Sequence, residues 1–330
     1  MTRPRRQLAS RPSRGFSLIE LMVSLTIGLV IAIAAMSAYL GAAGSSKLSD
    51  AQSRMNEDAQ AALNVLAQQI RMAGTNPVQG NRPDPFRHNP VYDPTYVGGS
   101  VTAYANGTTT YSVSSGTSSF SIRGCDGTFS SVTATTSLDV LANCGTSTLP
   151  DSIAVSYEAD RYNTVPSGNS PTDCVGSSLP TVTATFPIGT ASFSVADNRF
   201  YIGSVSNIPS LYCKGISSST QPLVENVEDM QLTYGTVSAT NTSTTATVAG
   251  YLTANEVVTE ANLAALPINE RWGKVLSVRV CIVMRSENPV VSDAASGQYF
   301  KCDGTLDTSQ TDLRLRRAYT TTVVLRNRRF

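Results

Sequence analysis

The chain has 330 residues, a formal net charge of +1 and one histidine. Five of its 25 basic residues are arginines that precede residue 16, and without them the 24 acidic residues leave the chain near −4. This balance excludes the overall basic footprint of a nucleic-acid-binding protein. The length allows one large domain or two small ones.

The first element is a basic leader followed by a long apolar run. The leader contains five arginines and no acid, and Leu21 to Ser46 carries no charged residue. At 1.5 Å per residue, such a helix crosses a bilayer core of about 30 Å. The positive-inside rule leaves the N-terminus in the cytoplasm and sends everything after about residue 45 across. The small residues Ala38 to Ser46 keep a cleaved signal peptide open, but the length of the run favours a signal anchor.

Glu20 stands at the head of this apolar helix. A carboxylate at mid-bilayer costs about 2.5–3.5 kcal/mol, and less near the interface, so it needs a partner. One partner is the α-amino group of a neighbouring subunit whose chain begins at Phe16, after cleavage between Gly15 and Phe16. In the alternative, Glu20 belongs to an uncleaved anchor and reaches the headgroups. The carboxylate alone leaves both possibilities open.

The segment Gly15 to Val23, GFSLIELMV, resembles the class III signal of type IV prepilins. The resemblance implies that Gly15 is the last leader residue and that Phe16 becomes the N-methylated first residue of the mature chain. It also implies that prepilin peptidase cuts between them, and that Glu20 is the carboxylate used in assembly. Major pilins usually carry a helix-kinking proline in the apolar run. No proline occurs between Phe16 and Asn76, so the helix is either kinked at a glycine or has no kink. The candidate glycines are Gly28, Gly41 and Gly44.

Apolar residues then recur at intervals of three, four and seven, which predicts that residues 46–75 continue as an amphipathic helix packed on a globular head. The apolar positions are Leu48, Met55, Ala59, Ala62, Leu66, Ile70 and Ala73. Gly74 and Pro77 supply the stop. Alternatively, the assembly helix of residues 16–45 and the amphipathic helix are separate, with a break at Gly41 to Ser46.

The centre of the chain is rich in turn-forming residues. Asn76 to Pro94 is a proline-rich connector, in which the single His88 is interpreted as a solvated side chain. Beyond it, alternating apolar residues predict strands around Ile153 to Tyr157 and Met230 to Tyr234. Ser/Thr-rich tracts predict surface loops. These tracts are Thr108 to Thr110, Ser217 to Thr220 and Thr240 to Thr247.

The C-terminal part has clearer patterns. Thr253 and Glu256 form a capping box ahead of a helix predicted to run through Ala265. Alternation over residues 276–285 predicts a half-buried strand, and residues 319–325 predict a last one. The polar positions of the first strand are Ser277, Arg279, Cys281 and Arg285. Together these elements predict an α+β fold, in which a long helix lies along an antiparallel sheet.

Six cysteines in an exported segment predict a disulfide set, and the absence of C-x-x-C argues against a zinc ribbon. Six cysteines allow 15 pairings. Pairing between sequence neighbours is the prediction, because each bridge then closes a modest loop. The predicted bridges join Cys125 to Cys144, Cys174 to Cys213, and Cys281 to Cys302.

Three segments resemble the PilW minor pilins: Leu223 to Gly235, Trp272 to Val280 and Arg317 to Asn327. The resemblance covers the N-terminal helix and about the last hundred residues, so residues 95–220 are interpreted as a variable part of a head that spans 76–330. It implies a minor pilin of the inner membrane and then of the cell-surface pilus. There it would help initiate assembly near the tip and support twitching, adhesion or DNA uptake. The implied partners are other minor pilins, a tip adhesin, the major pilin and the assembly platform. J-type pseudopilins of type II secretion are similar and supply the alternative.

Signatures of catalysis are absent from the sequence: it contains no G-x-S-x-G, S-x-x-K, phosphate loop or histidine pair. No catalytic residue, metal or cofactor is therefore expected, and an anchored periplasmic enzyme is the weakest hypothesis. Glu228 and Asp229 are predicted to be solvated, and a calcium loop at Asp303 and Asp307 lacks further oxygen ligands.

An arginine cluster near the C-terminus is the one local charge anomaly, and it comprises Arg314, Arg316, Arg317, Arg326, Arg328 and Arg329. Such a patch attracts the phosphates of DNA regardless of sequence. The favoured interpretation places these arginines on the polar faces of edge strands, where charges discourage unwanted pairing, or against an acidic partner subunit.

Overall fold

A computed structural model of the protein describes residues 15–75, 101–105, 109–113, 121–130, 144–145, 150–186, 189–215, 220–237 and 247–325. The leader, His88, Arg326, Arg328 and Arg329 lie outside the described residues. The chain divides into two compact units, Met1–Asp50 and Ala51–Phe330.

Helix α1 runs from Leu18 to Met72 without interruption, so the predicted break at Gly41 to Ser46 does not occur. In the first unit its apolar side chains are exposed, and the helix is long and apolar enough to cross a membrane. Leu48 is also exposed, at 37%, which corrects its predicted place in the buried stripe. Gly74 lies in the turn that follows the helix; it has a positive φ of 69°, and its N–H donates to the Ser156 carbonyl at 2.9 Å.

In the second unit, one face of α1 is buried at the predicted spacing. The buried residues are Met55, Ala59, Ala62, Leu66, Ala67 and Ile70. Two polar residues interrupt this contact and hydrogen-bond to strands. Asn56 accepts from the Tyr319 hydroxyl at 2.6 Å, and Gln69 accepts from the Asn198 amide at 2.8 Å and the Tyr157 hydroxyl at 3.4 Å. These bonds fix the rotation of the helix on the head.

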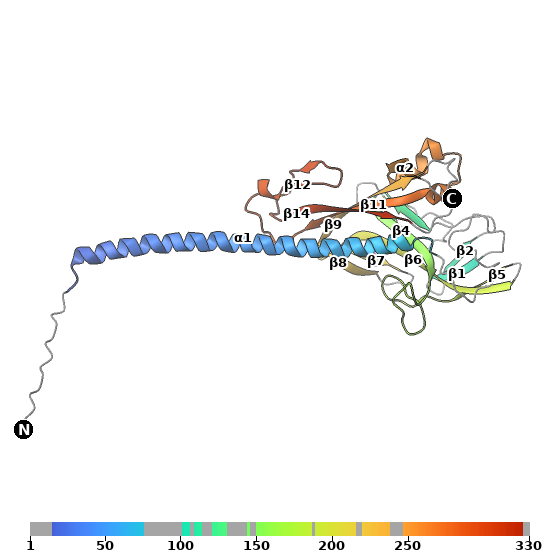
Figure 1. The fold of residues 1–330 in the computed structure, drawn as a ribbon, viewed down its shortest axis with the longest axis horizontal. Helices are drawn as coiled ribbons and strands as arrows, with labels where there is room; N and C mark the ends of the chain where they lie inside the picture. The colour runs from blue at the N-terminus through green and yellow to red at the C-terminus, as the bar shows by residue number, and fades with distance from the viewer. Residues whose placement is uncertain are drawn as a thin grey trace, which may run out of the picture. The chain divides into compact units, whose positions relative to one another are not determined.

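A four-stranded antiparallel sheet holds the strands predicted near the C-terminus, in the order β10-β9-β11-β14. Its strands are β9 (Val227–Thr236), β10 (Gly250–Leu252), β11 (Val275–Arg285) and β14 (Arg316–Val324). Figure 1 labels three of these strands, β9, β11 and β14. Tyr234, Val278 and Val323 lie opposite one another and are buried, so this face belongs to the core. Strand β11 is more buried than its alternation predicts, because Ser277 and Cys281 on the other face are covered as well.

A second, six-stranded antiparallel sheet has the order β3-β4-β6-β7-β8, with β5 paired to β6. Its strands are β3 (Ile122–Cys125), β4 (Ser152–Ala159), β5 (Val182–Phe186), β6 (Gly189–Val205), β7 (Ile208–Lys214) and β8 (Thr220–Glu225). The sequence predicted β4 but missed the long β6–β7 hairpin. Its turn residues, Ser206 and Asn207, both have positive φ, as a tight hairpin turn requires.

Shorter elements complete the described fold. They are β1 (Val101–Ala105), β2 (Thr109–Val113), α2 (Ala254–Thr259), η2 (Ala261–Leu263), α3 (Ile268–Gly273), η3 (Ala295–Gly297), β12 (Tyr299–Phe300) and β13 (Leu306–Asp307). Thr109 and Thr110 lie in β2, so the loop predicted there is wrong, and the β-branched threonines pair with β1. Thr220 likewise begins β8.

The capping box of α2 is confirmed, since Thr253 and Glu256 exchange both hydrogen bonds. The helix is nevertheless shorter than predicted and does not reach Ala265. Glu260 leaves the helical conformation, with φ −57° and ψ 124°, and its side chain accepts from the backbone N–H of Asn262 to cap η2.

Three disulfides join sequence neighbours, with separations of 19, 39 and 21 residues. The bridges are Cys125–Cys144, Cys174–Cys213 and Cys281–Cys302, the same pairs that the sequence predicted. The third ties the β12–β13 hairpin to β11, on the face of that strand that points away from the core.

Candidate assembly site

The N-terminal segment places the predicted processing residues at the start of α1. Gly15 and Phe16 precede the helix, and Phe16 is 85% exposed. Ser17 and Glu20 form a reciprocal cap: the Ser17 hydroxyl accepts from the Glu20 N–H at 3.2 Å, and the Glu20 carboxylate accepts from the Ser17 N–H at 3.3 Å. The S-x-x-E spacing carries this signal, but the sequence analysis considered Glu20 only as an assembly carboxylate or as a group that reaches the headgroups, not as a cap. Glu20 therefore also stabilises the first turn of α1.

The cap leaves the negative charge of Glu20 without a cationic partner within the described part of the first unit. Around it, Leu18, Ile19, Leu21 and Met22 are exposed apolar side chains. A carboxylate among apolar side chains at a helix N-terminus is suited to pairing with an amine supplied from outside this chain.

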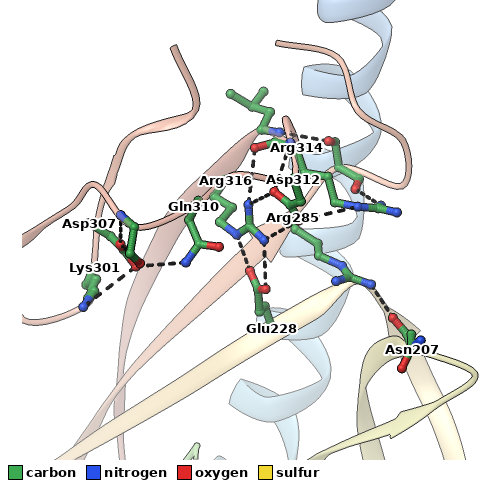
Figure 2. Close-up of polar contacts among 12 residues, drawn as sticks. Asn207, Glu228, Arg285, Lys301, Asp307, Gln310, Asp312, Arg314 and Arg316 are labelled. Atoms are coloured by element: carbon green, nitrogen blue, oxygen red, sulfur yellow. Dashed lines mark hydrogen bonds and ion pairs between the residues drawn. The ribbon is translucent and has the colours of Figure 1, made fainter. Parts of the chain in front are cut away.

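A second polar site lies at the start of β14, where Arg316 is 4% exposed and binds two carboxylates (Figure 2). Its Nη2 atom donates to Glu228 at 3.0 Å and to Asp312 at 2.8 Å, and its Nη1 atom donates to Asp312 at 2.7 Å. Burial lowers the pKa of Arg316, but the hydrogen bonds to Asp312 and Glu228 outweigh this and raise the pKa overall. Glu228 is thus an ion-pair partner, which corrects its prediction as a solvated acid.

Two arginines near Arg316 donate to backbone carbonyl groups. Arg314 donates to the Ser286 carbonyl at 2.7 Å and to the Glu287 carbonyl, and Arg285 donates to the Asn207 carbonyl at 2.6 Å. Of the predicted arginine cluster, Arg314, Arg316 and Arg317 are described, and Arg317 alone among these three is exposed. The described arginines mainly hold the segment between β11 and β14, which argues against a DNA-binding patch made from them.

The acidic loop around β13 satisfies its carboxylates internally. Asp303 accepts from the N–H and hydroxyl of Thr305, at 2.8 and 2.7 Å. Asp307 accepts from Ser309 at 2.6 and 2.8 Å and from Gln310 at 3.1 Å, and Lys301 lies 3.8 Å away. Among the described residues, no group of three or more His, Cys, Asp or Glu side chains is arranged to hold a metal.

Asp151 joins the two sheets and was missed by the sequence analysis. One of its oxygens accepts from the Gly127 N–H at 3.0 Å, next to β3, and the other accepts from the Leu232 N–H of β9 at 2.7 Å. Burial raises the pKa of Asp151 to about 7, against the opposing effect of these two N–H groups. No motif marks the residue, because its role depends on two strands that meet only in the folded head.

Comparisons with known families agree with the two ends of the chain. A family profile described as prokaryotic N-terminal methylation motif matches residues 10–36, and one described as type IV pilus-assembly protein W matches residues 199–327. The chain is a type IV pilin of the PilW family. No curated protein and no solved structure matches it significantly.

The PilW match contains the three segments that carried the resemblance, and it begins inside residues 95–220, for which none was found. It includes Glu228, Asp312 and Arg316, so the ion-pair site lies in the family-matched part of the head. Membership of this family makes the chain a minor pilin that associates with other pilins and the pilus assembly machinery, and indicates a structural role.

Proposed function

We propose that this PilW-type minor pilin helps to initiate the type IV pilus and lies at or near its tip, where it supports twitching, adhesion or DNA uptake. One combination of features supports this proposal. The apolar helix is exposed and begins with Glu20, which caps the helix but has no cationic partner among the described residues, and the head is disulfide-bonded and matches the PilW family. Other minor pilins, a tip adhesin and the major pilin are its proposed neighbours. No side-chain arrangement among the described residues supports catalysis, so we propose that the protein acts by binding these neighbouring subunits.

The proposed route begins in the inner membrane. The basic leader stays in the cytoplasm, α1 spans the bilayer, and the head lies on the far side. Prepilin peptidase then cuts between Gly15 and Phe16, and Phe16 becomes N-methylated. Phe16 is exposed ahead of the first helical turn, so both reactions have access to the backbone at this junction.

Glu20 would then pair with the N-terminal amine of an adjacent subunit during assembly. In the apolar surroundings of packed helices, an ion pair is favourable only when its geometry is good, so the pair selects a register as well as adding affinity. The hydrogen bond from Ser17 positions the carboxylate for this contact.

Mass spectrometry of the intact protein and its N-terminal peptide tests the processing. The sample is taken from native membranes and from sheared surface fibres. A chain that begins at methylated Phe16 and is present in the fibres supports the proposal. A chain that begins at Met1, or one cut near Ala43 and released as a soluble protein, contradicts it.

Two variants separate the charge of Glu20 from its capping role. Glu20→Gln keeps an acceptor for the Ser17 N–H but removes the charge, whereas Ser17→Ala removes the hydroxyl cap and keeps the charge. We expect Glu20→Gln to lower recovery in fibres at least about tenfold, since one uncompensated amine costs more than 1.4 kcal/mol. Ser17→Ala should assemble nearly normally. The reverse order would show that Glu20 acts only as a cap.

The J-type pseudopilin alternative makes a different prediction. Deletion of the chain would then stop enzyme secretion, while pili and twitching would persist. Loss of pili with normal secretion supports the proposed pilus role instead.

A further inference from the structure

The open edge of the four-stranded sheet is the feature that the pilin role leaves unexplained. Strand β14 pairs only with β11 in the described part of the chain, over nine residue pairs from Arg316 to Val324. From Ala318 to Val324 it carries no charge, and five of these seven residues are threonine or valine. Thr320, Thr322 and Val324 are exposed, Val324 at 57%.

The register shows which backbone groups face outward. The Ser286 N–H donates to the Leu315 carbonyl and the Leu325 N–H donates to the Leu276 carbonyl, so the hydrogen-bonded pairs across β11 and β14 involve odd-numbered residues of β14. The N–H and C=O groups of Thr320, Thr322 and Val324 therefore point away from β11. No described residue forms a hydrogen bond with them. They form a ready template for another strand.

Three other edge strands of the two larger sheets, β8, β10 and β3, carry features that discourage strand addition. Strand β8 contains Pro222, and its pairing with β7 shifts register between Leu211 and Tyr212. Strand β10 has only three residues and β3 has only four, so each offers few backbone groups to an added strand. Arg316 lies at the start of β14, but its side chain does not protect the edge because it binds Glu228 and Asp312. The sequence prediction that arginines guard this edge is therefore wrong for Arg316.

We infer that the edge of β14 from Thr320 to Val324 receives an extended strand from the head of another pilin subunit in the same filament. This rests on the proposed function, because subunits held in one membrane or filament present such a strand at high effective concentration. Main-chain hydrogen bonds to the outward groups supply the affinity. Exposed Arg317 lies at the start of this edge, so the added strand is uncharged at its centre and carries an acidic residue beside Arg317.

Amide hydrogen exchange with residue resolution tests the inference on the full chain. Dilute protein in detergent is compared with the same chain in sheared fibres. We expect the amides of Thr320, Thr322 and Val324 to exchange at least about tenfold more slowly in fibres, while those of Thr321 and Val323 are slow in both samples. Equal exchange of the outward amides in both samples would overturn the inference. Protection that grows with concentration in the isolated chain would identify a second copy as the occupant and overturn the assigned partner.

A pair of lysine variants tests the consequence for assembly. Thr322→Lys places a charge on the open edge, and Thr308→Lys makes the same change on an exposed loop. We expect Thr322→Lys to reduce recovery in fibres about tenfold with an unchanged melting temperature, and Thr308→Lys to match the parent. Normal assembly of Thr322→Lys contradicts the inference alone. Absence of the parent chain from fibres contradicts the proposed function as well.

Discussion

At the scale of single residues, Arg316 is the charge on which the β11–β14 connection depends. Arg316→Met removes the shared partner of Glu228, which is half-buried, and of Asp312, whose side chain is 38% exposed. We expect a loss of about 1–3 kcal/mol in the free energy of unfolding, measured by denaturant titration with the disulfides intact. Arg317→Met is the matched control, because the neighbouring Arg317 is exposed, and it should change stability by less than about 0.5 kcal/mol. Equal losses would assign the effect to charge alone.

Two aspartates give the head opposite responses to pH. The pKa of Asp151 is raised to about 7, so the folded head keeps a proton that the unfolded chain loses near pH 4, and stability falls as the pH rises between these values. Hydrogen bonds from Arg316 lower the pKa of Asp312 to about 2, so its contribution is lost as the pH falls from about 4 to 2. Thermal melts across pH 2–8 should show both slopes.

The variant Asp151→Asn separates the two responses. It should flatten the slope between about pH 4 and pH 7 and leave the acid limb unchanged. It should also be less stable than the parent throughout, by about 1–3 kcal/mol, because an amide cannot accept from both N–H groups. An unchanged slope would mean that Asp151 is ionised in the folded head across this range.

At the scale of elements, the half-buried amide of Gln69 is one of two polar contacts that dock α1 on the head. Gln69→Leu removes the acceptor shared by Asn198 and Tyr157. It should cost about 1–3 kcal/mol because the Tyr157 hydroxyl loses its acceptor and the Asn198 amide keeps only its 3.3 Å bond to Tyr157. The adjacent Gln68 is exposed, so Gln68→Leu should be nearly neutral. Denaturant titration measures both, and equal effects would contradict the role given to Gln69.

Periodicity predicted the elements that pack by one apolar face. The stripe from Met55 to Ile70, the capping box at Thr253 and the strand pattern around Val280 are local signals, and the structure contains each. The β6–β7 hairpin was missed because its strands are rich in serine and small residues, and its turn, Ser206-Asn207, is a weak signal. Burial of Cys281 on the second face of β11 depends on a hairpin more than ten residues away in sequence, which no local pattern reports.

At the scale of the whole molecule, the sequence revealed the N-terminal methylation motif but not the polar sites of the head. Gly15, Phe16 and Glu20 belong to one contiguous motif, so their spacing alone marks them. Arg316 and Glu228 are 88 residues apart, and Asp151 and Leu232 are 81 apart. Only the strand order brings these pairs together. The open edge of β14 could not be predicted for the same reason, since the strand order decides which strand lies at the edge of a sheet.

The pairing of cysteines with their sequence neighbours has a consequence for biogenesis. Under the proposed topology the head emerges from the membrane with its N-terminal end first. Each even-numbered cysteine in order of emergence then finds its partner as the only free thiol already outside. An oxidant that acts as thiols appear produces the native set without reshuffling, whereas six thiols exposed together have 15 possible arrangements. Maturation should therefore proceed normally in cells that lack a disulfide isomerase, with the Cys125–Cys144 bridge detectable first.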